Sequence, residues 1–497
     1  MKAIVSKIPH IILSFYVIFC VSLLVWVVKY SGSGDGDTLE HVHSSWLVYL
    51  GKVPYKDFFQ HHNPLLWYLG APLVGYFKYS LTAVDAVNYL TVLITALTML
   101  FIFLINKKYL SNSVGGLIAA AFFAFPHDSL YNKDFKPDNF MVFAIVVGLY
   151  YLLKYIKKRD LLSLCVSFLS FFISFMFTQK AVLILLGIGI IILYLIYDKK
   201  VSIKDCLYSA IIPILIFFTY LVYLHHNDIL SLYFKANFEL NTHIPSVFHT
   251  RRFIYPNLEM DIPILFSMLG CFIYLYKDNT YAKVCGLAFI FEYIIRLFYF
   301  TPFVYYFAFL HAVSSIYAGY VVSRIINKYK YFIWIIIAYF LIIGGLYAKI
   351  YSKRITVGDD YKYGASGFVL RLTNPCDYIL NGYRIGYNLF GKDVDYIWNL
   401  LGQIDVIAST IGIRPLADLE ALIRQKRPKI IYGKNYYDTY LEYRGQIGIQ
   451  PIHWISSHLL NEMYIPLNRD DLYILKPEFQ KYDCRYSPRT KTYEYYD

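Results

Sequence analysis

Charged residues are scarce in this 497-residue chain: Asp, Glu, Lys and Arg make up 16% of it, against about 25% in an average soluble domain. Hydrophobic residues make up 58%, and the mean hydropathy is +0.44. This composition excludes an ordinary soluble enzyme and predicts an integral membrane protein. The sequence also lacks internal repeats and low-complexity segments, which excludes a repeat architecture.

Cysteine is rare as well, with seven residues, and no CxxC or Cys/His spacing typical of a zinc site occurs. Five of the cysteines lie in or beside apolar runs, where they are expected to be small hydrophobic residues. Cys376 and Cys484 fall in the polar C-terminal region, and they can pair if that region lies outside the cytoplasm. The sequence leaves this pairing open.

Acidic residues are outnumbered by basic ones, 34 to 47, which gives a net charge of +13. A basic balance can indicate a nucleic-acid partner. Here Lys and Arg concentrate in short loops between apolar runs, which is the distribution that the positive-inside rule describes. We therefore expect the lipid bilayer, and no nucleic acid, as the partner of these charges.

Long apolar runs are the main feature of the chain. The first covers residues 8–28, which is longer than the ~7–15 residues of a cleaved signal peptide's apolar core and long enough to cross a ~30 Å bilayer core. A run at 65–77, interrupted by Pro and Gly, is too short to count and could be re-entrant or interfacial. About eleven transmembrane helices are predicted, the first at 8–28 and the others near 84–105, 114–126, 139–156, 161–177, 181–197, 207–225, 260–276, 281–300, 303–323 and 330–350.

The orientation follows from the loops, because short basic loops stay in the cytoplasm. Under this rule the N-terminus is inside, and the protein is a multi-pass plasma-membrane protein whose C-terminal domain faces the periplasm or the extracellular space. The basic loops are 106–110, 154–160, 197–205, 276–283 and 324–330. The predicted outer segments are 29–83, 127–138, 178–180, 226–259, 301–302 and everything after about 351.

Residues 351–497 differ in kind from the rest of the chain. Charged residues return, and short strand-like alternations occur at 377–380, 428–433 and 471–477, with a helical period over 415–428. The predicted architecture is an all-α polytopic membrane domain over 1–350, with a first outer loop at 29–83, and a small extracytoplasmic α/β domain over 351–497.

Titratable groups gather just where the chain leaves its first predicted span. "GDGDTLEHVHSSW" (34–46) contains Asp35, Asp37, Glu40, His41 and His43. Asp37 is placed to cap a helix, with Glu40 three residues further on as in a capping box. One interpretation is a solvated helix start without chemistry; the other is a polar cluster that faces a cavity above the membrane.

The same segment has helical periodicity. Glu40, His41 and Ser44 fall on one side, whereas Leu39, Val42, Trp46 and Tyr49 share another, which predicts an amphipathic helix at the interface. The loop then continues with further polar groups, Asp57, His61, His62 and Asn63. Long ordered loops are usually functional, so this loop is the first candidate for a site.

The first outer loop resembles that of the GT-C fold glycosyltransferases. The resemblance is carried by an Asp after the first span followed by "LEHVHSSWLVYLGKVPYKDFFQHHNPLLWYL" (39–69). The superfamily includes the protein O-mannosyltransferases and the aminoarabinose transferases of lipid A. Its usual pattern has Asp, often Asp-Glu, about fifteen residues before a Gly. Asp37 precedes Gly51 by fourteen residues, but Thr38 follows it directly, which leaves the choice between Asp37 and Glu40 open.

Three further stretches resemble the same superfamily in the same order. They are "FKPDNF" (135–140), "TQKAVLIL" (178–185) and "RLFYFTPFVYYFAFLHA" (296–312). The likeness thus covers about residues 10–325, together with the general plan of a C-terminal outer domain. The first loop is its specific part, and the other stretches are weak when taken alone.

The resemblance implies a mannosyltransferase-like reaction in which a sugar moves from a polyprenyl phosphate to an acceptor hydroxyl with inversion. The acceptor would be an envelope glycan, a glycolipid or a protein. A carboxylate must take the acceptor proton; Asp37 is the first choice and Glu40 the second. Cations must stabilise the departing phosphate. The expected substrate-binding residues are Lys136, Asp138, Lys180, Arg251, Arg252, Arg296, His61, His62 and Asp57.

No cofactor is required by this reading, although a divalent metal remains open. If one binds, Asp35, Asp37, His41 and His43 are its expected ligands, but "HVH" and "HH" are not specific metal spacings. Two other functions stay open: a polytopic transporter, or a non-catalytic scaffold of envelope polysaccharide biosynthesis. Few ionisable residues lie at span centres, and paired broken helices are absent, which argues against a transporter.

Overall fold

The computed structural model describes residues 7–30, 36–124, 131–243, 258–277, 279–298, 307–353, 365–380, 388–396, 408–415, 418–432, 455–467, 472–480, 483–487 and 492–496. The chain forms two compact units, each built from separate stretches of sequence. The helical unit comprises Met1–Ser31, Asn88–Val222 and Phe248–Ile355, and the mixed unit comprises Gly32–Val87, Tyr223–Val247 and Thr356–Asp497.

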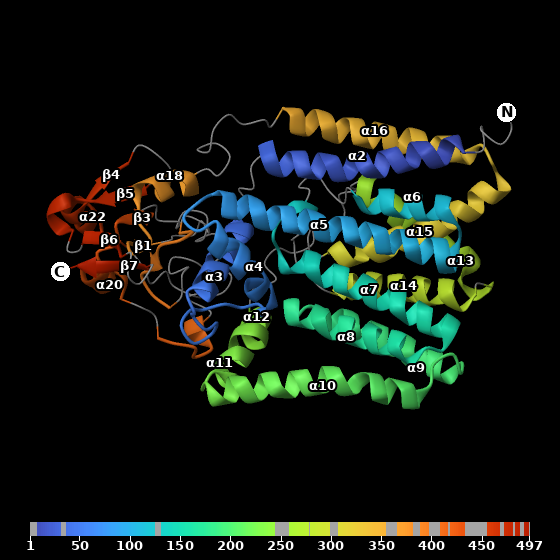
Figure 1. Ribbon diagram of the computed structural model, residues 1–497, viewed down its shortest axis with the longest axis horizontal. Coiled ribbons are helices and arrows are strands. Elements are labelled where there is room, and N and C mark those ends of the chain that lie inside the picture. The colour runs from blue at the N-terminus through green and yellow to red at the C-terminus, as the bar shows by residue number, and fades with distance from the viewer. Residues whose placement is uncertain are drawn as a thin grey trace. The chain divides into compact units, whose positions relative to one another are not determined.

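Long helices make up the helical unit, because each apolar run forms a helix that satisfies its own backbone hydrogen bonds. Every predicted run falls on one of them, so the polytopic all-α architecture is confirmed (Figure 1). The helices are α2 (Ile8–Tyr30), α5 (Thr82–Ile105), α6 (Ser113–Ala124), α7 (Pro137–Lys158), α8 (Leu161–Phe177), α9 (Ala181–Tyr197), α10 (Ile203–His226), α13 (Leu258–Tyr274), α14 (Thr280–Phe298), α15 (Ala308–Lys328) and α16 (Phe332–Ser352).

By length and composition, six helices among the described residues are able to cross a membrane: α2, the helix that covers Thr82–Leu110, α7, α10, α15 and α16. Five apolar helices of 10–17 residues accompany them. The chain is therefore an integral membrane protein, whereas the predicted number of eleven spans stays a prediction.

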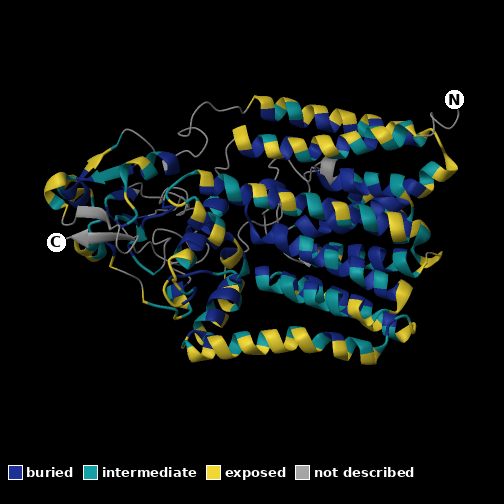
Figure 2. Ribbon diagram, viewed as in Figure 1, coloured by how far each residue is buried: buried dark blue, intermediate teal, exposed yellow. Residues whose placement is uncertain are grey.

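Close packing in the helical unit is concentrated on α15, which is largely buried, whereas α10 is largely exposed (Figure 2). Small residues allow α15 to approach α6. A Cβ added at Gly319 would lie 2.6 Å from both the Gly115 carbonyl oxygen and the Ala119 Cβ. Small residues at such contacts are typical of helix packing in membranes, where backbones approach closely.

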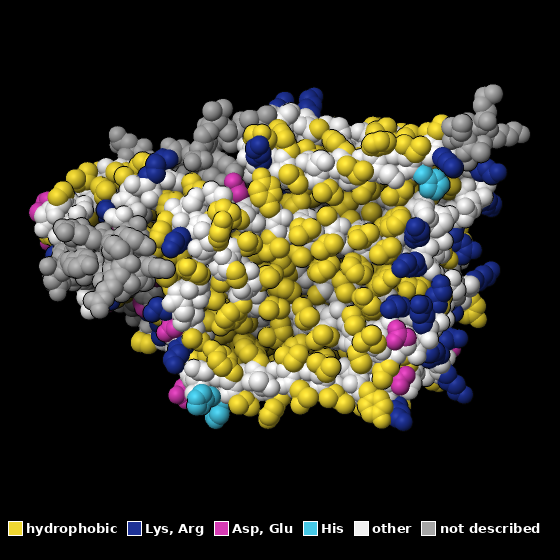
Figure 3. All heavy atoms as spheres, in the orientation of Figure 1, with side chains coloured by type: hydrophobic (Ala, Val, Ile, Leu, Met, Phe, Trp, Pro, Cys, Tyr) yellow, Lys and Arg dark blue, Asp and Glu magenta, His cyan; other side chains and the backbone are white. Residues whose placement is uncertain are grey.

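The surface of the helical unit has an apolar region and a basic region. Figure 3 shows a broad apolar face over its helices, with Lys and Arg side chains gathered at the end where α9 passes into α10. The predicted cytoplasmic loops fall at junctions of consecutive helices: α5 to α6, α7 to α8, α9 to α10, α13 to α14 and α15 to α16. Short basic connections of this kind are what the positive-inside rule uses to assign orientation.

The mixed unit combines the first outer loop with the C-terminal region. The loop contains α3 (Gly36–Tyr49) packed against α4 (Leu65–Tyr76), which is the short run predicted at 65–77. A second segment contributes α11 (Leu230–Phe234) and α12 (Leu240–His243).

A five-stranded sheet organises the C-terminal region and confirms the predicted α/β character. Its strand order is β2-β1-β3-β5-β4, with β1 parallel to β2 and β3, and β5 antiparallel to β3 and β4. The buried core consists of Val369, Ile379, Ile430 and Leu472. The elements are α18 (Ala365–Leu372), β1 (Tyr378–Leu380), β2 (Lys392–Asp393), α20 (Leu419–Lys426), β3 (Ile430–Tyr432), α22 (Ser457–Met463), β4 (Tyr464–Pro466), β5 (Leu472–Leu475) and the hairpin β6 (Asp483–Ser487) and β7 (Thr492–Tyr496).

The cysteines differ between the two units. The five that lie in or beside apolar runs are free thiols, as their positions predict. Cys376, in the C-terminal region, is disulfide-bonded. The side chain of Cys484 lies outside the described residues, so its predicted pairing stays a prediction.

Candidate functional site

Asp37 lies at the beginning of α3, but not at the position that the sequence predicts. The helix begins at Gly36, so Asp37 is inside the first turn rather than at the N-cap, and the predicted capping box is wrong. A carboxylate in the first turn is still stabilised by the helix dipole. Asp37 is partly exposed, whereas Asp35 lies outside the described residues.

The predicted amphipathic character of α3 is also wrong, because residues 38–46 are all buried (Figure 2). Both faces of the helix are covered by protein. Glu40, His41, His43 and Ser44 tolerate burial because they find hydrogen-bond partners in other segments of the mixed unit. Ser45 instead donates to the His41 carbonyl of its own helix.

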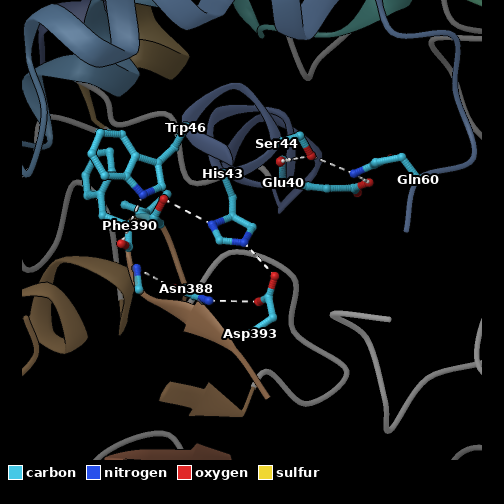
Figure 4. Close-up of polar contacts among 10 residues, drawn as sticks. Glu40, His43, Ser44, Trp46, Gln60, Asn388, Phe390 and Asp393 are labelled. Atoms are coloured by element: carbon cyan, nitrogen blue, oxygen red, sulfur yellow. Dashed lines mark hydrogen bonds and ion pairs between the residues drawn. The ribbon is translucent and has the colours of Figure 1, made fainter. Parts of the chain in front are cut away.

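Glu40 is one of these buried side chains, with 7% of its surface exposed. The Gln60 side-chain amide donates to Glu40 Oε1 over 3.0 Å and to Ser44 Oγ over 2.7 Å, as Figure 4 shows. One amide group therefore holds two polar residues of α3. Gln60 belongs to the quoted loop motif, although the sequence alone did not single it out.

His41 lies beside two further histidines of the motif. Its Nδ1 accepts a hydrogen bond of 3.1 Å from the Trp67 indole. Because the indole N–H can only donate, His41 is unprotonated at Nδ1. The His62 ring lies 5.6 Å from that of His41 and 4.2 Å from that of His61, centre to centre. The structure thus brings together three residues that the sequence selected separately.

Asp57 is exposed and accepts a hydrogen bond of 2.7 Å from the Val53 amide. This local bond closes the turn that precedes Phe58, a role that Asp often has in turns. The Tyr55 hydroxyl donates to the His62 carbonyl, and Tyr396 donates to the Tyr55 carbonyl over 2.6 Å. These motif residues therefore shape the loop through local hydrogen bonds.

Both ring nitrogens of His43 are engaged within the mixed unit. Nδ1 donates to the Leu389 carbonyl over 3.2 Å, and Nε2 lies 2.8 Å from Asp393 Oδ2. Burial alone would lower the pKa of His43, but the charge and hydrogen bond of Asp393 outweigh it and raise the pKa. His43 is therefore occupied as an ion-pair partner, and the arrangement does not support a metal-binding role for it.

The described part of the chain contains no group of three or more His, Cys, Asp or Glu side chains that could hold a metal ion. His41 and His43 belong to separate hydrogen-bond networks, the first with Trp67 and the second with Asp393. The donors that the structure describes thus do not form the predicted ligand set, of which Asp35 lies outside the described residues.

In the helical unit, the "FKPDNF" stretch forms the start of α7. Lys136 is the N-cap residue, Pro137 follows in the first turn, where its missing N–H is harmless, and Asp138 completes that turn. Lys180 directly precedes α9, and its Nζ lies 3.1 Å from Asp138 Oδ1. Both side chains of this ion pair are buried or nearly so.

Backbone contacts fix the loop that leads into α7. Asn132 donates to the Phe123 carbonyl over 3.2 Å, and Asn88 accepts from the Phe135 amide over 3.0 Å. Asn139 donates back to the Asp134 carbonyl over 2.8 Å. A loop held in this way can present charged groups in one geometry.

Arg296 is buried near the end of α14 and pairs with Glu292, one turn earlier, over 2.5 Å. This pairing, rather than snorkelling to water, satisfies the guanidinium. The sequence reasoning missed Glu292, although its spacing of four residues from Arg296 was a usable signal. Arg251 and Arg252 lie outside the described residues.

The predicted site residues that the structure describes are divided between the two units. The mixed unit holds Asp37, Glu40, His41, His43, Asp57, His61 and His62, and the helical unit holds Lys136, Asp138, Lys180 and Arg296. Sequence reasoning also missed Asp393, because a distance of 350 residues along the chain leaves no local signal.

Comparison with known proteins identifies the fold. Residues 71–223 match the family model for dolichyl-phosphate-mannose-protein mannosyltransferase. The structure is similar to that of ArnT from Cupriavidus metallidurans bound to undecaprenyl phosphate, with 13% identity, coverage of 94% of this chain and 99% of that one, and a TM-score of 0.56.

The structure is also similar to the archaeal oligosaccharyltransferase AglB from Archaeoglobus fulgidus in complex with an inhibitory peptide and a dolichol-phosphate. The identity is 12%, the coverage is 98% of this chain and 74% of that one, and the TM-score is 0.52. No curated protein matches the sequence. The family-model match and the fold together confirm the predictions of a GT-C fold and of a membrane glycosyltransferase.

Proposed function

We propose that the protein transfers a sugar from a polyprenyl-phosphate donor to an acceptor hydroxyl of an envelope glycan, a glycolipid or a protein. The observation that carries the proposal is α3, which holds two carboxylates within one turn directly after the first long apolar helix. The two solved structures of similar fold carry undecaprenyl phosphate and dolichol-phosphate, which supports a polyprenyl phosphate as the donor's carrier.

Asp37 is the proposed general base. A base must reach the acceptor hydroxyl within hydrogen-bond distance. Asp37 is partly exposed, whereas Glu40 is buried and accepts from Gln60. Glu40 is the second choice, and its proposed role is to support the geometry of α3. Direct attack of the activated hydroxyl on the anomeric carbon would invert its configuration.

Lys180 and Lys136 are the proposed partners of the donor phosphate. When the bond from sugar to phosphate breaks, negative charge grows on the phosphate oxygens, and fixed cations stabilise it. Asp138 holds the Lys180 ammonium in place over 3.1 Å, so the cation needs little reorganisation. Arg296 is already balanced by Glu292 and is assigned a secondary role.

The reaction is proposed to take place on the outer face of the membrane. The basic connections between helices would be cytoplasmic, which places the N-terminus inside. The disulfide at Cys376 supports an extracytoplasmic C-terminal region, because disulfides persist in oxidising compartments.

A transfer assay in nanodiscs tests the proposal. Purified wild type, Asp37→Asn and Glu40→Gln would be given a panel of polyprenyl-phosphate sugars and envelope acceptors, with and without chelator. Loss of a general base lowers the rate by about 10²–10⁴-fold, so this loss is expected for Asp37→Asn with retained folding. Asp377→Asn removes a carboxylate that pairs with Lys429 next to the C-terminal sheet, away from α3, and serves as the control.

Each result is informative. Full activity of Asp37→Asn would refute the base assignment and move it to Glu40. Absence of turnover by the wild type with every donor and acceptor supplied would contradict the proposed function.

A further inference from the structure

Three hydrogen bonds join α3 to residues 388–393 of the C-terminal region (Figure 4). His43 Nδ1 donates to the Leu389 carbonyl, and His43 Nε2 reaches Asp393 Oδ2 at 2.8 Å. One turn further along, the Trp46 indole donates to the Phe390 carbonyl over 3.1 Å. Two adjacent turns of one helix therefore bind one short segment that lies about 345 residues later.

The receiving segment is itself held in shape. The Asn388 amide donates to Asp393 Oδ1 over 2.8 Å, and Asn388 Oδ1 accepts from the Gly391 amide over 2.8 Å. Asp393 also belongs to β2, which pairs with β1 of the sheet. Both carboxylate oxygens of Asp393 are thus engaged, one by α3 and one by its own segment.

Aromatic packing seals this contact from water. The Trp46 ring lies edge-on to Phe390, with 5.5 Å between centres, and 5.1 Å from the ring of Tyr79. His43 and Trp46 are both buried. Because water is excluded, the hydrogen bonds and the ion pair act at low effective dielectric and are stronger than on the surface.

Helix geometry connects this contact with the carboxylates of the proposed site. Glu40, His43 and Trp46 follow one another at three-residue intervals, and residues three apart are neighbours on a helix surface. Gln60 holds Glu40 from the first loop, and Asp393 holds His43 from the C-terminal region. Two different segments therefore prevent α3 from turning about its axis.

We propose that His43 and Asp393 are positioning residues for the transfer reaction, and that the C-terminal region takes part in catalysis by fixing α3. The inference rests on the proposed function. Asp37 and Glu40 are rigidly connected to His43 through the helix backbone, so a rotation of α3 moves both carboxylates. A misplacement of about 1 Å can lower a rate by about 10²-fold.

The test compares His43→Gln, Asp393→Asn and the double variant with wild type, using Asp377→Asn as the control. Two readouts are measured: kcat and KM for a polyprenyl-phosphate sugar, and hydrogen exchange of the α3 amides over residues 40–46. We expect kcat to fall by about 10- to 100-fold with little change in KM, and exchange to increase in α3. The double variant should resemble the single ones, because all three break one link.

The control separates positioning from general stability. The Asp377 side chain binds Lys429 and the Asn374 amide, and neither bond reaches α3. Its contact with the linking segment is made by the backbone carbonyl, which accepts from the Lys392 amide over 2.9 Å and is kept in Asp377→Asn. Asp377→Asn should therefore leave kcat and α3 exchange unchanged. If Asp393→Asn does not fold, Trp46→Phe removes the bond to Phe390 and part of the ring packing but keeps the pair of His43 with Asp393, and should give a smaller change in the same direction.

Folded single variants with wild-type kcat and wild-type α3 exchange would overturn the inference. An equal loss of activity in Asp377→Asn would overturn it too, because the effect would then be general destabilisation. If the wild type transfers no sugar but hydrogen exchange in α3 still increases in the variants, the structural link is supported and the proposed function is refuted.

Discussion

Two buried ion pairs, one in each unit, join residues at very different distances along the chain. In the helical unit, Arg296 finds Glu292 within one turn of α14. In the mixed unit, His43 of α3 finds Asp393, 350 residues later. A pair within one helical turn neutralises a buried charge, and its two residues come together as soon as the helix forms. A distant pair also fixes one segment against another, and can therefore couple a proposed catalytic helix to the C-terminal region of the same unit.

The largest expected effect comes from breaking the local pair. Glu292→Gln removes the carboxylate that pairs with buried Arg296, and breaking a buried ion pair by removing one partner costs about 3–5 kcal/mol of folding free energy. The Tm of the detergent-solubilised protein should fall clearly. The double variant Glu292→Gln/Arg296→Met should recover most of it, because no buried charge remains. A single variant as stable as wild type would show that Arg296 is compensated by another group.

Lys180 comes next, because it is proposed to act on the donor phosphate. Lys180→Met should lower kcat by about 10²–10³-fold, as expected for loss of a fixed electrostatic group. Lys154 pairs with Asp160 in a predicted cytoplasmic loop, so Lys154→Met is the matched control and should remain active. Equal activity of the two variants would exclude Lys180 from the site.

These contrasts show what the sequence could predict. The apolar runs predicted the helices well, with α8 and α9 matching residue for residue, because in a membrane each helix satisfies its own backbone. Of the strands in the C-terminal region, β1, β3 and β5 fall within the predicted stretches, whereas β2, β4, β6 and β7 were not predicted. Strand order was not predicted either, since pairing is decided by contacts distant in sequence. Local sequence patterns were therefore sufficient to predict the fold class.

The site was less predictable than the fold. Periodicity gave α3 a polar face of Glu40, His41 and Ser44, but Gln60 and Trp67 cover that face. Asp393 engages His43 from another part of the chain, and none of these partners has a local signal. The selected residues His41, His61 and His62 do come together, because all three belong to one loop. Residue types at the site were thus predicted, whereas their partners required the structure.

The ion pair between His43 and Asp393 should also affect how stability depends on pH. His43 has a pKa of about 6.5 in the unfolded chain, and its pKa is raised in the folded protein, chiefly by Asp393 acting against burial. Its stabilising contribution is therefore complete below about pH 6.5 and is lost as the pH rises through the raised pKa. The Tm difference between wild type and His43→Gln should shrink from pH 6 to pH 9, and a constant difference would contradict the ion pair.

The smallest expected effect compares two aspartates at helix starts. Asp418 is a true N-cap of α20 and accepts from the Ala421 amide over 3.1 Å, whereas Asp37 lies inside the first turn of α3. Asp418→Ala should lower stability by about 1 kcal/mol and leave transfer unchanged. Asp37→Asn should do the reverse, because its carboxylate is proposed to meet the acceptor rather than a backbone amide. If Asp37→Asn lost stability but kept its transfer rate, Asp37 would be a structural residue like Asp418.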